Sequence, residues 1–184
     1  RFLGFDFPAS YYQSVNSVFI ILLAPLFAAI WVKLGKAGRE PTSVVKFAIG
    51  MALIAVSFIV MLPTLPAVQS GQRSSGIYLV ALYFFSTCSE LCISPVGLSS
   101  MSRLAPRRMG GMVMGIWFLG AAIGNYFAGR AAGFSESRGF GFLFYTLIIA
   151  ALVVAGGLLA VAPTIRRMMA SDESELPKAK VVDA

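Results

Sequence analysis

Residues 83–98 read YFFSTCSELCISPVGL and lie within a long apolar run. Glu90, near their middle, is the only carboxylate in any apolar span of the chain. On insertion scales, an ionised carboxylate at the centre of a membrane helix costs about 3 kcal/mol. Such a residue must face a polar partner, a water-filled cavity or a bound molecule. We therefore expect Glu90 to mark a functional site on a membrane-spanning helix.

Helical spacing predicts a polar seam around Glu90. Residues three, four and seven apart share a helix face, so the seam is expected to contain Tyr83, Ser86, Thr87, Ser94 and Gly97. The opposite face is expected to carry Leu79, Leu82, Phe85 and Ile93. The Ser94-Pro95 pair predicts a break in this helix, because proline has no N–H to donate.

Composition is typical of an integral membrane protein. Of 184 residues, 58% are hydrophobic and 12% are charged, whereas a soluble domain has about 25% charged residues. The net charge of +7 does not indicate nucleic-acid binding, because Lys and Arg lie between the apolar runs and form no basic helix face. Without His, a nucleophile–base pair, a metal cluster or a phosphate loop, we expect neither an enzyme nor a bound metal or organic cofactor.

Five apolar segments are long enough to cross a membrane, which takes about 20 residues. They are predicted at Tyr12–Val32, Val44–Leu62, Ile77–Ser100, Met112–Ala132 and Phe140–Ala162. The predicted fold class is therefore all-α integral membrane, with residues 1–169 as the transmembrane bundle. Pro25 predicts a kink in the first span. Residues 170–184 are polar and mixed in charge, which predicts a disordered cytoplasmic tail.

Charges between the spans predict the orientation. The first and third connections and the segment after the last span are the most basic, which places them in the cytoplasm. Their cations are Lys33, Lys36, Arg39 and Lys46, then Arg103, Arg107 and Arg108, then Arg166 and Arg167; the other connections carry Arg73, Arg130 and Arg138. The chain is thus expected to start outside the membrane and end inside. The odd number of spans and the missing initiator Met favour a fragment.

Small residues are expected to pack helices together. Cys88 and Cys92 lie four apart on one helix, without further metal ligands, and are interpreted as packing residues. The Gly111/Gly115 and Gly120/Gly124 pairs follow the small-x-x-x-small pattern, which lets helix backbones approach closely.

Three motifs together resemble the proton-dependent oligopeptide transporters, a branch of the major facilitator superfamily. They are QSVNSVFIILLAP at 13–25, ELCISPVGLSSMSRLAP at 90–106 and GIWFLGAAIGNYFAG at 115–129. Their order and spacing are similar to those of the family, and the resemblance extends over nearly the whole chain up to the tail.

The resemblance implies that the five spans are helices eight to twelve of a twelve-helix fold, and so most of its C-terminal six-helix bundle. The implied function is the C-terminal portion of a di- and tripeptide symporter that is driven by protons and works by alternating access in the cell (inner) membrane. Its implied partners are peptides, the lipid bilayer and the missing N-terminal half. The family's E-x-x-E-R-F motif and the cations that hold the peptide carboxylate belong to that half.

The resemblance also implies site residues. Glu90 matches the carboxylate that receives the peptide amino terminus, and it is expected to take part in proton coupling. Asn16 matches an amide that contacts the peptide backbone, and Gln13 is expected to line the same face. Ser94 matches a polar residue of the pocket, and Trp117 matches a tryptophan that bounds a side-chain pocket.

Two alternatives remain open at this point. The chain could belong to a related facilitator for nitrate or another small solute. It could also be a non-transporting membrane scaffold subunit that assembles through its glycine-rich helices.

Overall fold

The computed structural model describes residues 9–72, 74–104 and 108–175, and this part of the chain is helical apart from short turns. Its elements are α1 (Ala9–Lys36), α2 (Ser43–Met61), the 3-10 helix η1 (Leu62–Thr64), α3 (Leu65–Gln69), α4 (Gly76–Leu104), α5 (Gly110–Arg138) and α6 (Phe140–Glu175). Side chains at 9–13, 103–104, 134–137 and 165–175 lie outside the described part. The all-α prediction is confirmed.

Five helical stretches of the described residues are long and apolar enough to cross a membrane. They are Ser14–Lys36, Ser43–Gln69, Gly76–Ser102, Gly110–Gly133 and Phe140–Thr164. Each coincides with one of the predicted spans, because a run of about 20 apolar residues has few other stable arrangements. The second stretch is longer than α2, since it continues through η1 and α3.

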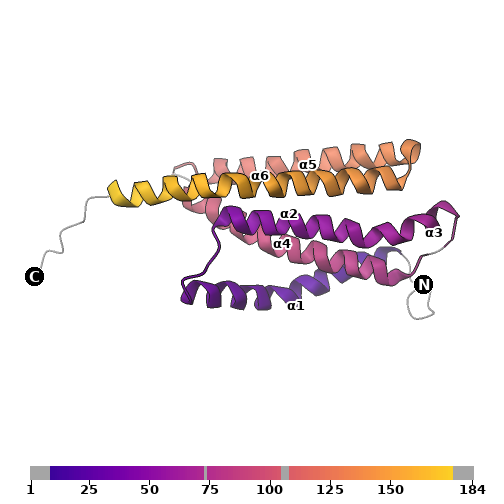
Figure 1. Cartoon of the computed structure of the whole chain (residues 1–184), viewed down its shortest axis with the longest axis horizontal. Coiled ribbons are helices and arrows are strands. Elements are labelled where there is room, and N and C mark those ends of the chain that lie inside the picture. Colours follow the sequence, from indigo (N-terminus) through magenta and orange to yellow (C-terminus); the bar gives the residue numbers. More distant parts are fainter. Residues whose placement is uncertain (1–8, 73, 105–107, 176–184) are drawn as a thin grey trace, which may run out of the picture.

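The long helices lie side by side, and consecutive ones run in opposite directions (Figure 1). α2 packs chiefly between α4 and α6, α1 lies against α4, and α5 lies beside α6. The core between α2 and α6 contains Ala55, Ile148 and Ala151. These small and branched side chains allow the two helices to pack closely, as is common between membrane helices.

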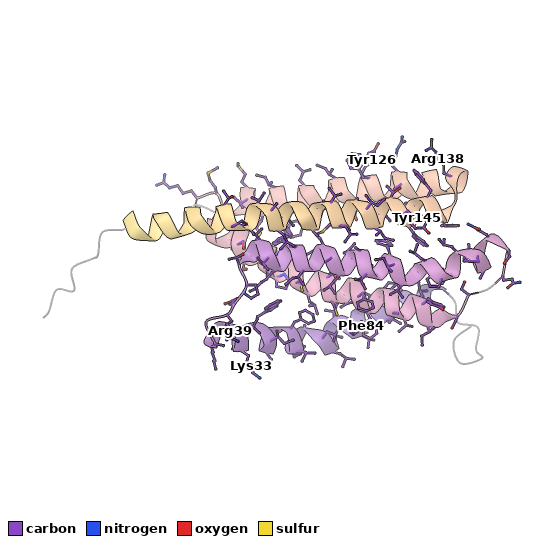
Figure 2. The ribbon with its side chains drawn as sticks, in the orientation of Figure 1. Lys33, Arg39, Phe84, Tyr126, Arg138 and Tyr145 are labelled. Carbon is purple, nitrogen blue, oxygen red and sulfur yellow. The ribbon has the colours of Figure 1, made fainter. Side chains whose placement is uncertain are left out.

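The outward faces of the bundle are apolar. Ile21 on α1 is 72% exposed and Val153 on α6 is 67% exposed. Tyr126 projects from α5 away from the other helices (Figure 2) and is 64% exposed. A soluble protein seldom leaves so large an apolar surface uncovered. These faces therefore suit contact with lipid chains or with further helices.

Proline residues interrupt the helices less than the sequence suggested. α4 runs without a break through Pro95, so the predicted break at Ser94-Pro95 is wrong. Cys92 and Val96 are buried on either side of the exposed Pro95, and this packing holds the chain helical where one backbone hydrogen bond is lost. α1 also continues through Pro25, and its ribbon changes direction partway along (Figure 1).

The predicted tail and some of the cations used to predict the orientation lie partly outside the described residues. α6 extends to Glu175, so residues 170–175 of the segment predicted to be disordered are helical, and residues 176–184 lie outside the described part. Of the cations used to predict orientation, Arg73 and Arg107 lie outside the described residues, as do the side chains of Arg103, Arg166 and Arg167.

Glycine mediates close packing at other positions than those predicted. A Cβ at Gly111, Gly115, Gly120 or Gly124 of α5 would meet nothing within 4 Å among the described residues. These pairs therefore do not join helices within this part of the chain. Gly50 of α2 does: a Cβ there would lie 2.5 Å from the Ile93 side chain and 3.2 Å from the Ser89 carbonyl of α4. Ser89 Oγ also donates a hydrogen bond to the Gly50 carbonyl, at 2.7 Å.

Lys46 is buried, although its sequence suggested a loop cation that only sets orientation. Its Nζ lies 2.5 Å from Glu40 Oε1 and 4.7 Å from the centre of the Trp31 ring. These three residues, the Lys46 cluster, join the end of α1, the loop after it and the start of α2. Lys33 and Arg39 lie at the same end of α1 (Figure 2) and are exposed. Lys46 therefore fastens α1 to α2.

We expect Glu40→Gln to destabilise the protein more than Lys46→Met. Glu40→Gln leaves a buried ammonium without its carboxylate, whereas Lys46→Met removes the buried charge and keeps most of the apolar stem. The Lys46 side chain is 9% exposed and Glu40 is 49% exposed, so solvent screening keeps the expected loss for Glu40→Gln near 2 kcal/mol. Thermal unfolding of the purified protein in detergent measures the difference.

The matched control is Lys33→Met, which removes an exposed cation at the same end of α1 and should change the melting temperature little. A Glu40→Gln protein as stable as Lys33→Met would show that the ion pair does not hold α1 to α2.

Candidate functional site

Glu90 lies in the third spanning helix, α4, and its side chain is exposed. Among the described residues, no hydrogen bond or ion pair joins it to another group. A carboxylate that the fold leaves open in a membrane-spanning segment is available to bind a polar ligand or water. None of the described side chains therefore occupies the carboxylate that the sequence singled out.

Contacts of α4 with α1 and α2 determine which side of α4 carries Glu90. α4 meets α1 through Phe84, whose ring centre is 5.6 Å from that of Phe19 (Figure 2). It meets α2 through Ser89 and Ile93. At about 100° per residue, Glu90 lies roughly 120° around α4 from Phe84 and about 100° from Ser89. The carboxylate therefore occupies a side of α4 between its contacts with α1 and α2.

Asn16 reaches α4 one helical turn from Glu90. Thr87 Oγ1 lies 2.6 Å from Asn16 Oδ1 and donates a hydrogen bond to it. Thr87 is fully buried, and Asn16 is half-buried. Thr87 and Glu90 are three residues apart, which is about 4.5 Å along the helix axis. The structure thus brings the amide of α1 close to the level of the carboxylate of α4.

Trp117 of α5 contacts α4 on the C-terminal side of Glu90, whereas Asn16 contacts it on the N-terminal side. A Cβ added to Gly97 would overlap the Trp117 ring, so the indole lies directly on the Gly97 backbone. Phe47 of α2 contacts the ring edge-on, with centres 6.5 Å apart. Gly97 is seven residues from Glu90, which is about 10 Å along the helix and on nearly the same side. Trp117 therefore bounds the side of α4 that carries Glu90, toward the C-terminal end of the helix.

Of the two remaining predicted site residues, the structure describes the side chain of Ser94 but not that of Gln13. Ser94 is half-buried and lies one turn from Glu90 on α4. The backbone of Gln13 belongs to α1, but its side chain lies outside the described part. Within the predicted seam, Thr87 and Gly97 are buried by contacts with α1 and α5, whereas Tyr83, Ser86 and Ser94 remain partly open beside Glu90.

These groups can recognise a zwitterionic or cationic ligand. A carboxylate forms charge-assisted hydrogen bonds with an ammonium. An amide offers both N–H donors and a carbonyl acceptor. An indole supplies a flat apolar surface. No group of three or more His, Cys, Asp or Glu residues in the described part of the chain is placed to hold a metal ion.

Sequence reasoning did not assign a role to Thr87, although it lies three residues before Glu90. Its signal was available: a hydroxyl in an apolar helix must find an acceptor, either its own backbone or a neighbouring helix. Which neighbour it binds depends on the packing of α1 against α4, and no sequence pattern specifies that packing.

Comparison with known proteins places the chain in a wider context. The model of the family described as POT matches residues 1–142. The chain is 38% identical over 178 residues to a Yersinia enterocolitica protein named peptide transporter YePEPT, covering 94% of this chain and 35% of that protein. It is 32% identical over 188 residues to the dipeptide and tripeptide permease A of Escherichia coli, covering 94% and 36%.

A solved structure agrees with these matches. The crystal structure of a peptide transporter POT in complex with sulfate superposes on the chain with a TM-score of 0.79 at 42% identity, covering 90% of this chain and 33% of that one. The chain therefore spans about a third of the length of the proteins that it matches.

We expect Gly97→Ala to destabilise the protein by about 1–3 kcal/mol, because the new methyl group would displace the Trp117 ring from a packed position. The matched control is Gly124→Ala in α5, where a Cβ meets nothing within 4 Å and the effect should stay within about 0.5 kcal/mol. Thermal unfolding in detergent measures both variants.

The double variant Gly97→Ala/Trp117→Leu tests whether contact with the Trp117 ring causes the loss of stability. If the indole is what the methyl group meets, the smaller Leu should recover part of the lost stability. Equal melting temperatures for Gly97→Ala and Gly124→Ala would contradict the contact.

Proposed function

We propose a function from one premise: this chain belongs to the POT family of transporters. The proposal is that it forms the C-terminal part of a symporter that moves di- and tripeptides together with protons by alternating access. The whole transporter would include an N-terminal bundle that is not part of this chain, which spans about a third of its relatives.

The open carboxylate of Glu90 carries the proposal. It is exposed on α4 and makes no hydrogen bond or ion pair among the described residues. The relatives are named as transporters of peptides, and at neutral pH a free peptide has an amino terminus that is protonated. We infer that Glu90 binds this ammonium, because a charge-assisted hydrogen bond offsets the cost of a carboxylate in the membrane.

The neighbouring groups support a site for the rest of the peptide. Asn16, one turn away on α1, would contact the peptide backbone, with Gln13 on the same helix. Ser94 would add a hydroxyl one turn along α4, and Trp117 would bound a pocket for a side chain. Varied peptide side chains suit an indole, which offers apolar area with one polar group.

Coupling and location follow as further parts of the proposal. Glu90 would exchange a proton as well as bind substrate, and the coupling ion would be the proton, with no organic cofactor or metal. The protein would reside in the cell membrane with this chain starting outside and ending in the cytoplasm, as loop charge favours. It would transport its substrate without chemical change and so not act as an enzyme. The N-terminal bundle would supply the cations for the peptide carboxylate.

We expect Glu90→Gln in the complete transporter to abolish uptake of a labelled dipeptide while the protein still inserts into the membrane. Gln keeps the size of the side chain but loses the charge that attracts an ammonium. Uptake is measured in cells or proteoliposomes and normalised to the amount of protein in the membrane. Ser99→Ala, on another side of α4, should retain uptake. Undiminished uptake by Glu90→Gln would remove Glu90 from the mechanism.

Substrate class can be tested by competition and by binding. Unlabelled di- and tripeptides should compete for uptake, whereas nitrate should not. A dipeptide should also raise the melting temperature of the purified transporter in proportion to its binding. Competition by nitrate would favour the small-solute facilitator. A melting temperature that no candidate substrate changes would favour a scaffold subunit.

A further inference from the structure

Much of α5 is not covered by the other described helices. Every residue from 118 to 130 is exposed, whichever way its side chain points. The helix is attached at Trp117, which is half-buried against Gly97 of α4. Tyr126 projects from the opposite side, away from the other helices (Figure 2). The two flanks between Trp117 and Tyr126 are therefore both open.

These two flanks differ in the size of their side chains. At about 100° per residue, one flank lies about 80–160° around α5 from Trp117 and the other about 200–280°. The first, the Asn125 flank, consists of the exposed residues Gly115, Phe118, Ala122, Asn125, Gly129 and Gly133. The second, the large flank, consists of the exposed residues Met112, Ile116, Leu119, Ile123 and Phe127.

The Asn125 flank has the pattern of a surface that packs against a helix. Its members are spaced three or four residues apart, as in the seam between packed helices. A Cβ at Gly115, Gly129 or Gly133 would meet nothing within 4 Å among the described residues. Small residues are enriched where membrane helices approach closely. The Asn125 flank therefore suits a further helix, whereas the large flank suits lipid chains.

Asn125 needs a polar partner that the described residues do not supply. Its side chain is exposed, and no hydrogen bond joins it to another described residue. Within a membrane span, the polar groups of an amide are usually satisfied by a neighbouring helix. A group facing lipid chains would find no donor or acceptor there. The amide thus favours the same kind of neighbour as the small residues around it.

Asn125 also lies near the membrane depth of Glu90. It is eight residues from Trp117, which is about 12 Å along α5, and Glu90 is about 10 Å along α4 from Gly97. Trp117 lies on Gly97, and the two helices run in opposite directions (Figure 1). A helix on the Asn125 flank would therefore pass close to the level of the open carboxylate.

We propose that the Asn125 flank docks a membrane-spanning helix from the part of the transporter outside this chain. The inference rests on the proposed function, in which this chain is one part of a complete transporter. About two thirds of the length of its relatives lies outside this chain, so further segments are present to fill the flank. The docked helix carries a hydroxyl, an amide or a free backbone carbonyl opposite Asn125, because the amide requires a hydrogen-bond partner.

The sign of the effect of Asn125→Leu distinguishes a helix from lipid. If a helix supplies a hydrogen bond, Asn125→Leu should lower the melting temperature of the purified complete transporter in detergent. If the flank faces lipid or detergent, removing an unpaired amide should raise the melting temperature. An unchanged or higher melting temperature would overturn the inference. That holds also if the KM for a dipeptide rises, since Asn125 would then contact the substrate instead.

Added volume tests the close approach of the helix. Ala122→Leu should reduce both the amount of transporter in the membrane and its melting temperature, because a docked helix leaves no room for the larger side chain. The matched control is Ala150→Leu in α6, where Ala150 is exposed beside the large exposed side chains of Ile149 and Val154. Equal behaviour of the two variants would contradict a docked helix.

A photo-reactive side chain identifies the neighbour without adding volume at a small residue. Phe118 on the Asn125 flank and Phe127 on the large flank are 63% and 64% exposed, and they lie about 180° apart around α5. p-Benzoylphenylalanine in place of Phe118 should form a cross-link within one polypeptide, to a segment outside this chain that mass spectrometry identifies. In place of Phe127 it should form lipid adducts.

The cross-links also decide between the other possible neighbours. Adducts of position 118 with lipid alone would overturn the inference, as would a cross-link between two copies of the transporter. These results do not require transport. A transporter that takes up no dipeptide but forms the cross-link would contradict the proposed substrate and leave the docking surface in place. Uptake that depends on Glu90 without the cross-link would overturn the docking surface alone.

Discussion

Polar side chains inside a membrane-spanning helix have no water to bind, and this constraint arranges the contacts between the helices of the bundle. Ser89 of α4 donates to a backbone carbonyl of α2, and Thr87 of α4 donates to Asn16 of α1. Lys46 meets the same need near the start of α2, where it pairs with Glu40. Each of these bonds joins parts of the chain that are far apart in sequence or separated by a turn. Glu90 differs, because the described residues leave it unpaired.

The position of Glu90 is a consequence of how α4 is held. α1 and α2 contact α4 to either side of Glu90, and Trp117 of α5 lies on Gly97, about 10 Å further along the side that carries the carboxylate. Glycine makes two of the contacts possible. The Gly50 backbone meets α4 closely, and Gly97 of α4 provides the flat place on which the Trp117 ring lies. In both cases the missing Cβ lets a large neighbouring side chain approach the backbone.

Hydropathy predicted the spans well, because it is a local property of each segment. The five apolar runs became long helices at nearly the predicted positions. The errors came where packing between helices overrides a local preference. Pro95 does not break α4, since buried neighbours hold both sides of it. Lys46 is buried rather than left in an open loop.

From the sequence alone follow the all-α fold class, the membrane spans and the presence of one costly carboxylate in an apolar run. Each depends on the cost of exposing backbone or charge to hydrocarbon, and that cost is a property of a single segment. Only the tertiary structure decided that Thr87 would bind Asn16, that Trp117 would lie on Gly97 and that Glu90 would stay open. These results depend on the rotation and spacing of neighbouring helices, which many packed side chains determine together.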